Sequence, residues 1–344
     1  MTLKFVEHWL SYANGAGDTD QNGWFSDDVD YVVASADPRI AGGKYMNFPS
    51  GSGVFSRGVP GVATYFLNFS FLCWNTRTGL VYFLDSAVQH VAIVWNHTDS
   101  LIYVYRGNAS GTQIAVSTLT VSKDDWHHIE CKVTIDNTVG VVIVNIDGVE
   151  YINFSGDTQN AGTANINTIQ FVGPSNTTSP GINKYLGQVF IFDTAGSFWN
   201  DFQGDIACVA MPPTSDVTPN QFTPSTGTDH YAMVDEVVPD GDTTYLESST
   251  DAQQCLFAPD ALAANISELL GVVLENVSKK TDIDDNQISN YLKVSTTSTV
   301  STPTGLTTDY TYSRNIYESN PDTAVAWALA DWTNISFGFE NTVP

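Results

Sequence analysis

Short runs of alternating apolar and polar residues fill the chain between about residues 65 and 192. A period of two residues is typical of antiparallel strands that bury one face. Gly, Asn and Asp separate the runs, as expected for turns. The clearest runs are VAIVWN (91–96), LIYVYRG (101–107), HHIECKVTI (127–135), VGVVIVNIDGVEYINF (139–154) and YLGQVFIFD (185–193). We therefore expect a β-sheet structure here, without an amphipathic helix.

The pattern changes at MPPTSDVTPNQFTPSTGTD (211–229), which contains four prolines and many Ser and Thr residues. Proline fixes φ and lacks an N–H donor, so this stretch predicts a linker. Strand-like runs resume after it, among them ISELLGVVLENVSKK and ISFGFEN. The sequence predicts an all-β chain with a first sandwich at 1–212, a linker at 213–229 and a smaller β-sandwich at 230–344.

Composition agrees with two folded cores and limits the partners. The chain has 344 residues, of which 42% are hydrophobic and 15% charged, and this length exceeds one ordinary core. A net charge of −25 would repel a phosphate backbone, so we expect no nucleic-acid partner. The N-terminus carries Glu7 and His8 where a signal peptide would be apolar. No apolar run approaches the roughly 18 residues of a spanning helix, so we expect no membrane insertion. The four cysteines form no CxxC pair, which argues against zinc and a disulfide framework.

Two short motifs resemble a known fold family. Trp126-His127-His128, followed by the Asp147-Gly148 turn, resembles the signature of concanavalin A-like, laminin-G-type jelly rolls. The resemblance implies a lectin-like jelly-roll sandwich as the first domain. We expect Trp126 to anchor its core, His127 and His128 to alternate across the pleat, and Asp147-Gly148 to set the register of a hairpin.

A longer resemblance concerns GSFWNDFQGD (196–205), within 189–216, and VDEVVPDGDTTYLESST (234–250). Both segments are similar to segments of phage structural proteins. The resemblance implies a surface protein of a tailed-bacteriophage virion, made in the host bacterial cytoplasm, with other virion proteins as partners. A tail or tail-tip adhesin that binds host polysaccharide and a head decoration or head fibre remain open. The family implies a homo-oligomer, such as a trimer, and a second domain used for docking or oligomerisation.

A glycosidase on this fold would need a strand that carries catalytic carboxylates. Concanavalin A-like glycosidases carry an E-x-D-x-x-E strand that places nucleophile and proton donor on one face. This sequence contains no such strand. It therefore predicts a protein that is not an enzyme, with a glycan-degrading hydrolase as the alternative.

Two kinds of ligand remain as hypotheses. Calcium is a candidate cofactor, because carboxylates supply the hard oxygen ligands that it needs, although no full EF-hand loop is present. The candidate ligands are Asp18, Asp20, Asp201 and Asp205. A glycan needs an aromatic platform at a sandwich surface, and the alternative for each tryptophan is a place in the core. The candidate platforms are Trp24, Trp95 and Trp199.

Overall fold

The computed structural model describes residues 2–12, 24–26, 32–37, 43–48, 53–73, 78–172, 184–199 and 201–343. The chain forms two compact units, Met1–Cys208 and Val209–Pro344. Both consist of antiparallel strands, and the described helices are short 3-10 segments of three and six residues, so the predicted all-β fold class is confirmed. None of the described helices has the length and apolar character needed to cross a membrane.

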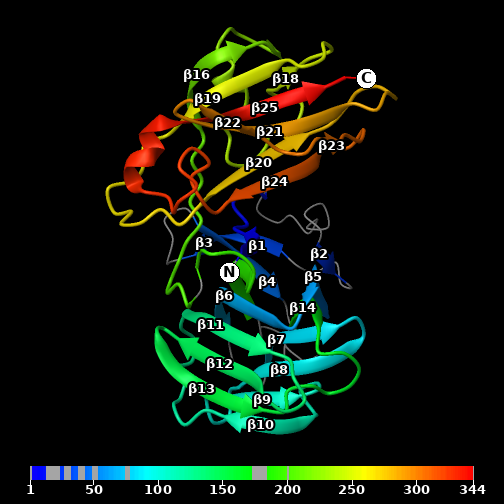
Figure 1. Ribbon diagram of the computed structural model, residues 1–344, viewed down its shortest axis with the longest axis vertical. Coiled ribbons are helices and arrows are strands. Elements are labelled where there is room, and N and C mark those ends of the chain that lie inside the picture. Colours follow the sequence, from blue (N-terminus) through cyan, green and yellow to red (C-terminus); the bar gives the residue numbers. More distant parts are fainter. Residues whose placement is uncertain are drawn as a thin grey trace. The chain divides into compact units, whose positions relative to one another are not determined.

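Unit 1 is a sandwich of two antiparallel sheets (Figure 1). Sheet A has the order β13-β12-β11-β6-β15-β4-β3, and β1 also pairs with β15. Its strands are β1 (Thr2–Glu7), β3 (Val32–Asp37), β4 (Gly43–Phe48), β6 (Thr64–Cys73), β11 (His127–Thr134), β12 (Gly140–Ile146), β13 (Val149–Gly156) and β15 (Lys184–Asp193).

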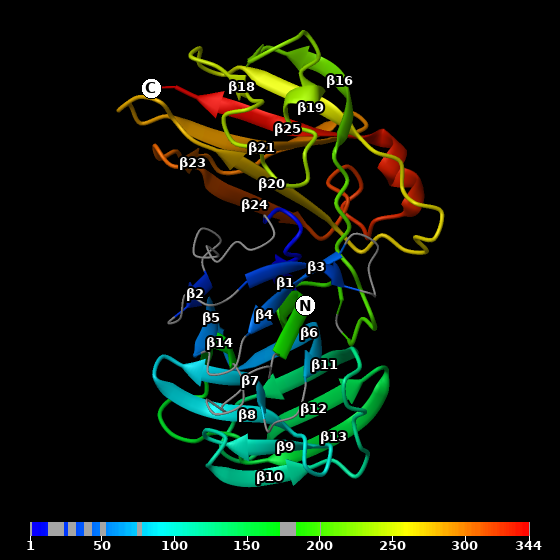
Figure 2. The same ribbon diagram turned by 180° about the vertical axis from the view of Figure 1, so that it is seen from behind.

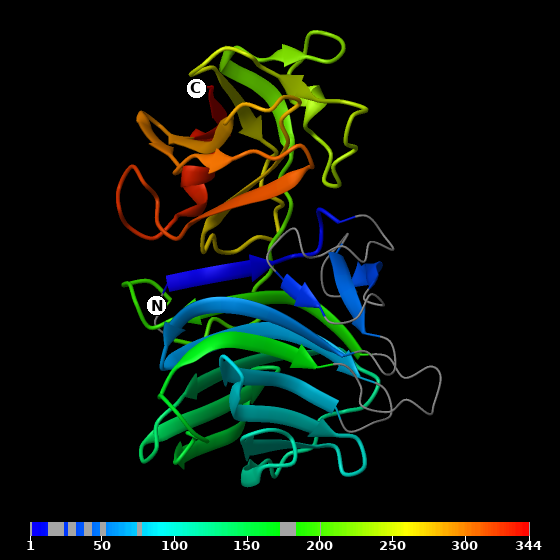
Figure 3. The ribbon, with the colours of Figure 1, turned by 90° about the vertical axis from the view of Figure 1, so that its right-hand side faces the viewer.

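Sheet B forms the second layer, in the order β10-β9-β8-β7-β14-β5-β2 (Figure 2). Its strands are β2 (Trp24–Ser26), β5 (Val54–Val62), β7 (Thr78–Asp85), β8 (Val88–Asn96), β9 (Leu101–Arg106), β10 (Thr112–Val116) and β14 (Ile166–Val172). A side view separates the two layers (Figure 3). Alternate side chains of both sheets meet in one apolar core, which is why the period-two pattern marked these strands.

The β12–β13 connection forms the predicted hairpin. Asp147 and Gly148 lie between the strands with φ values of 51° and 78°. A two-residue turn with positive φ at both positions matches the twist of the flanking strands, and Asp-Gly tolerates that conformation. The turn aligns Ile146 with Val149 and Val142 with Phe154.

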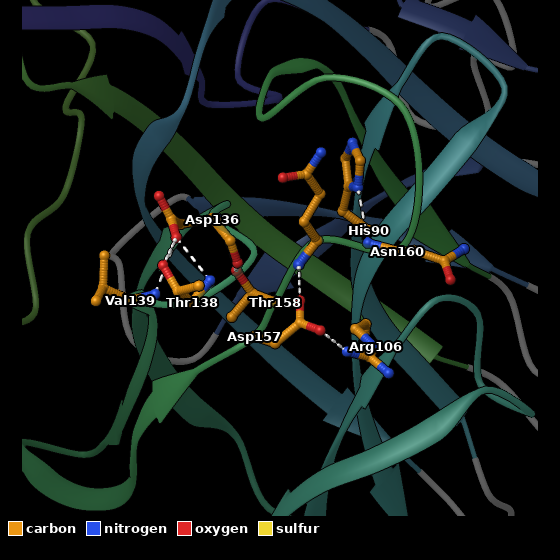
Figure 4. A network of polar contacts seen from close by, with 9 residues as sticks. His90, Arg106, Asp136, Thr138, Val139, Asp157, Thr158 and Asn160 are labelled. Atoms are coloured by element: carbon orange, nitrogen blue, oxygen red, sulfur yellow. Dashed lines mark hydrogen bonds and ion pairs between the residues drawn. The ribbon is translucent and has the colours of Figure 1, made fainter.

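The loop that follows β13 connects the two sheets at one end of unit 1 (Figure 4). The Thr158 hydroxyl donates to the carbonyl oxygen of Thr134 on β11, at 2.7 Å, and accepts from the N–H of Asp136, at 3.0 Å. Asp157 forms an ion pair with Arg106 on β9 of sheet B. One loop therefore supplies hydrogen-bond and ion-pair partners to residues of both sheets.

Lys184 makes a second connection between the sheets. This residue of β15 is completely buried, and its ammonium group donates to three backbone carbonyls of sheet B. The acceptors are Gly79 and Leu80 on β7, both at 2.9 Å, and Val172 on β14, at 3.0 Å. A buried cation is tolerated because every donor has an acceptor.

Unit 2 has a sheet of order β16-β19-β25-β21-β22, with β23 also paired to β21, and two short ribbons, β17-β18 and β20-β24. Its strands are β16 (Pro213–Asn220), β17 (Thr223–Pro224), β18 (Leu246–Glu247), β19 (Gln254–Pro259), β20 (Val272–Ser278), β21 (Gln287–Val294), β22 (Thr297–Val300), β23 (Thr304–Gly305), β24 (Thr311–Tyr317) and β25 (Ile335–Thr342). Apolar residues of β20, β21 and β25 share one core cluster, so the β20-β24 ribbon packs against the sheet.

The prediction of a linker at 213–229 is wrong, because this segment supplies β16 and β17 of unit 2. β16 is an edge strand that pairs only with β19, and its register shifts near Pro213 and between Val217 and Asn220. An edge strand with bulges accepts prolines because the missing N–H groups have no ladder partner to lose. The two units accordingly meet in sequence at residues 208 and 209, before the proline-rich stretch.

Candidate functional site

The outward face of sheet B carries three tyrosines from neighbouring strands. Tyr82 lies on β7, and Tyr103 and Tyr105 lie on β9. They alternate with core residues of the same strands, so they point away from the sandwich interior. Tyr82 and Tyr105 both align with Ala92 of β8, and Tyr103 aligns with Val94. We call these three residues the tyrosine face.

The rings of Tyr103 and Tyr105 lie nearly parallel at the half-exposed end of this face. Their centroids are 6.2 Å apart with an interplanar angle of 17°. The Tyr103 hydroxyl donates to Asp99 Oδ2 at 2.5 Å, and Asp99 Oδ1 accepts from the N–H of Leu101 at 3.1 Å. The hydrogen bond to Asp99 raises the pKa of Tyr103, because the phenol donates its proton to a carboxylate.

Uncharged side chains border the tyrosine face. Gln170 of β14 aligns with Tyr82, and its amide donates to Ser56 Oγ at 3.1 Å. Gln113 of β10 aligns with Tyr105. The register partners of the tyrosines are Ala92, Val94, Gln113, Val116 and Gln170. None of these five carries a charge, so the face offers aromatic rings and amides.

Two of the three tryptophans predicted as platforms, Trp24 and Trp95, lie in the core, and this corrects the prediction for them. Trp24 and Trp95 have 0% and 1% of their surface exposed and belong to the core of unit 1. The Trp24 indole donates to Glu7 Oε2 at 3.0 Å, so even its polar atom faces inward. Trp199 is half-buried and lies edge-on against Phe192, with ring centroids 5.7 Å apart. The sequence signal for the tyrosine face is Tyr-x-Tyr in LIYVYRG, which places two tyrosines on one face of a strand.

The prediction for Trp126 is also wrong, because this residue lies outside the sandwich core that it was expected to anchor. It is half-buried, and its ring stacks on Tyr185 with centroids 6.3 Å apart and an angle of 27°. Tyr45 contacts both rings. Trp126 precedes β11, so the strand alternation that directs side chains inward begins only after it.

His127 and His128 have different partners. His127 Nδ1 lies 2.6 Å from Asp147 Oδ2, whereas His128 Nε2 lies 2.7 Å from Asn68 Oδ1. Consecutive residues of β11 point to opposite faces of sheet A, so the two imidazoles cannot share one metal ion. The expected alternation across the pleat is thus seen in their contacts.

Residues 201–205 contact the outward face of sheet A. Glu130 Oε1 accepts from the N–H groups of Gln203, at 2.6 Å, and Gly204, at 2.8 Å. Burial raises the pKa of Glu130; the two N–H groups oppose this, and the charges of Asp201 and Asp205 add to it. The carboxylate therefore holds this segment to the sheet.

The calcium hypothesis finds no support in the structure. Asp18 and Asp20 lie outside the described residues. Asp201 and Asp205 are exposed. In the part of the chain that the structure describes, no three His, Cys, Asp or Glu side chains are grouped to hold a metal ion. We therefore assign no cation to Asp201 and Asp205, and calcium at Asp18 and Asp20 stays a prediction.

Comparisons with known proteins give structural likenesses only. No family model matches the chain, and no curated protein matches it. The alginate lyase Aly36B has a TM-score of 0.43 at 13% identity, over 55% of this chain and 96% of the lyase. An endo-β-1,4-glucuronan lyase from Trichoderma reesei has a TM-score of 0.38 at 12% identity, over 55% and 95%. The carbohydrate esterase vb_24B_21 of the Shiga toxin-encoding bacteriophage phi24B has 0.36 at 13%, over 54% and 98%.

These likenesses correct the prediction that the chain is not an enzyme. That prediction is wrong, because the structures that match include polysaccharide lyases and a carbohydrate esterase. It rested on the absence of one glycosidase pattern, and this absence excludes one reaction and leaves lyase and esterase chemistry open. At identities of 12–13% and TM-scores of 0.36–0.43, no substrate or reaction is transferred from these structures to this chain.

Proposed function

We propose that unit 1 is a carbohydrate-active domain that binds a polysaccharide across the tyrosine face. The observation that carries this proposal is the placement of the half-exposed Tyr103 and Tyr105 on one outward sheet surface, beside the buried ring of Tyr82. Pyranose rings present flat apolar C–H faces that pack on aromatic rings, while their hydroxyl groups need polar partners at the edge. Gln113 and Gln170 stand beside the rings to supply those partners.

The charge at this face favours a neutral glycan over a polyuronate. The register partners of the tyrosines are uncharged, and Asp99 accepts from Tyr103 at one end. A carboxylated sugar chain would meet this negative group and would find no cation among those register partners. We therefore expect neutral xylan to bind more tightly than alginate at low salt.

The tyrosine face is tested by two single substitutions and a titration. Tyr103→Ala and Tyr105→Ala each remove one stacking ring. We expect each to weaken the affinity for the polysaccharide that binds most tightly about 10-fold, or ~1.4 kcal/mol. Isothermal titration calorimetry with xylan and with alginate measures the change. Tyr245→Ala, at an exposed tyrosine of unit 2, is the matched control and should bind like the unchanged protein. Unchanged affinity in both tyrosine-face variants would reject the site.

The place of the protein on a phage particle is a further proposal that rests on sequence resemblance. GSFWNDFQGD (196–205) and VDEVVPDGDTTYLESST (234–250) support a surface component of a tailed-phage virion, on the tail or tail tip or on the head. In this proposal other virion proteins hold unit 2, copies assemble as a homo-oligomer, and weak glycan contacts add up over the copies. Gold-labelled antibody on intact particles distinguishes tail from head, and particles without label would contradict the proposal.

A further inference from the structure

Three side chains of unit 1 form a continuous Ser–His–Asp arrangement. Ser122 Oγ lies 3.0 Å from His127 Nε2, and His127 Nδ1 lies 2.6 Å from Asp147 Oδ2. Both separations are within hydrogen-bond distance, and each contact uses a different nitrogen of the imidazole. This is the order of atoms that activates a serine hydroxyl in nucleophilic catalysis.

The acid and the base are held by the fold. Asp147 lies in the β12–β13 turn with φ of 51°, its Oδ1 accepts from the N–H of His128 at 2.9 Å, and its own N–H donates to the His128 carbonyl at 2.9 Å. His127 is 7% exposed and packs on Phe71, with ring centroids 5.8 Å apart. Ser122, in contrast, is exposed, so a substrate can reach its hydroxyl.

The contacts define how a proton would move. When His127 Nδ1–H donates to Asp147, Nε2 is left with a lone pair and accepts from the Ser122 hydroxyl. After Nε2 takes that proton, the Ser122 carbonyl oxygen, 3.1 Å away, can accept from the new N–H. The imidazolium is then bonded at both nitrogens, which lowers the free energy of the charged intermediate.

We propose that Ser122 is the nucleophile of an ester-hydrolysing site, with His127 as general base and Asp147 as the residue that orients it. Ser122 Oγ attacks the acyl carbon while its proton passes to His127 Nε2. The bond from the acyl carbon to the alcohol oxygen breaks, and His127 protonates that oxygen. Water then attacks the acyl-serine and gives a proton to His127, and the released Ser122 oxygen takes it back. The products are a carboxylic acid and an alcohol.

Backbone donors are available beside the nucleophile. Within the described residues, the N–H groups of Lys123, Asp124 and Asp125 donate to no acceptor of the protein. Free N–H groups next to a nucleophile are the usual donors to the oxyanion of a tetrahedral intermediate.

The substrate class follows from where the site lies. The N–H of Val121 donates to the carbonyl of Ser100, at 2.8 Å, and Ser100 follows Asp99, the partner of Tyr103. The nucleophile therefore adjoins the turn that ends the tyrosine face. An O-acylated polysaccharide fits this placement, and this part of the inference rests on the proposed function, whereas the esterase chemistry does not.

The test uses the full chain, a fluorophosphonate probe and p-nitrophenyl acetate. We expect the probe to label Ser122, as located by peptide mass spectrometry, and acetate release above the buffer rate. Ser122→Ala should abolish the labelling and lower acetate release to the level of His127→Gln. Ser110→Ala, at an exposed loop serine of the same unit, is the matched control and should react like the unchanged chain.

Asp147→Asn separates catalysis from structure. Asn tolerates positive φ, so the turn should persist and the melting temperature should stay close to that of the unchanged protein. We expect its acetate release to fall about 10²-fold, because the imidazole loses its oriented, charged partner. Labelling that is absent, or that persists in His127→Gln, would overturn the inference. Titration of Ser122→Ala with xylan tests the glycan-binding proposal separately from the esterase proposal. A failure to bind xylan would reject glycan binding and would leave the labelling result unaffected.

Discussion

The Glu130 carboxylate is hydrogen-bonded and buried on the outer face of sheet A. It lies on the outward face of β11, where two backbone N–H groups of residues 203 and 204 meet one carboxylate oxygen. Burial nevertheless raises its pKa, and the nearby charges of Asp201 and Asp205 act in the same direction. The carboxylate therefore attaches a segment to the sheet at an electrostatic cost that depends on pH.

Glu130→Gln should make this cost visible in the pH dependence of stability. A raised pKa means that the folded state binds the proton more tightly than the unfolded state, so the contribution of this group is most favourable below its unfolded pKa and is lost as pH rises through the folded pKa. Glutamine keeps an acceptor oxygen without the charge. We expect the variant to melt higher than the unchanged protein at pH 7, with the difference shrinking toward pH 4. Scanning calorimetry across that range measures it, and a lower melting temperature of the variant at every pH would contradict it.

At the scale of elements, the centre of the unit 2 sheet depends on close backbone approach. β25 lies between β19 and β21, and Gly338 aligns with Leu256 on one side and Tyr291 on the other. A Cβ atom added at Gly338 would lie 1.8 Å from the carbonyl oxygen of Cys255. Only glycine permits this spacing, because the obstacle is backbone that cannot rotate away.

Gly338→Ala should therefore destabilise unit 2 selectively. We expect a loss of more than about 2 kcal/mol in its free energy of unfolding, since β19 or β25 must shift. Gly305→Ala is the matched control, because a Cβ there meets no atom within 4 Å. Denaturant unfolding curves, together with scanning calorimetry, distinguish the two variants. Equal stability of the two would show that the sheet adapts without cost.

At the scale of the whole molecule, the dominant electrostatic property is the net charge of −25. Like charges repel more strongly in the compact state than in the extended chain, and salt screens that repulsion. We expect the melting temperature to rise by a few degrees between about 0.01 M and 0.15 M KCl, as the screening length falls from roughly 30 Å to roughly 8 Å. A melting temperature that falls with salt would mean that ion pairs such as Lys4–Asp193 outweigh the repulsion.

Local features of the sequence determined the fold class and several of its parts. Alternation at 91–96, 101–107 and 127–135 predicted β8, β9 and β11, because which face a strand residue occupies depends only on its position along that strand. The Asp147-Gly148 turn was predictable for the same reason, since its φ values are a local preference.

Only the tertiary structure decided the environment of each strand face, which is solvent, the core or another segment of the chain. Trp24 and Trp95 are in the core while Tyr103 and Tyr105 are half-exposed, and periodicity does not tell these cases apart. Prolines at 213–229 predicted a linker, but an edge strand accepts them. Ser122, His127 and Asp147 meet because β11 and the β12–β13 turn are adjacent in sheet A. Such contacts depend on how strands pair, and the chain's local pattern does not contain that information.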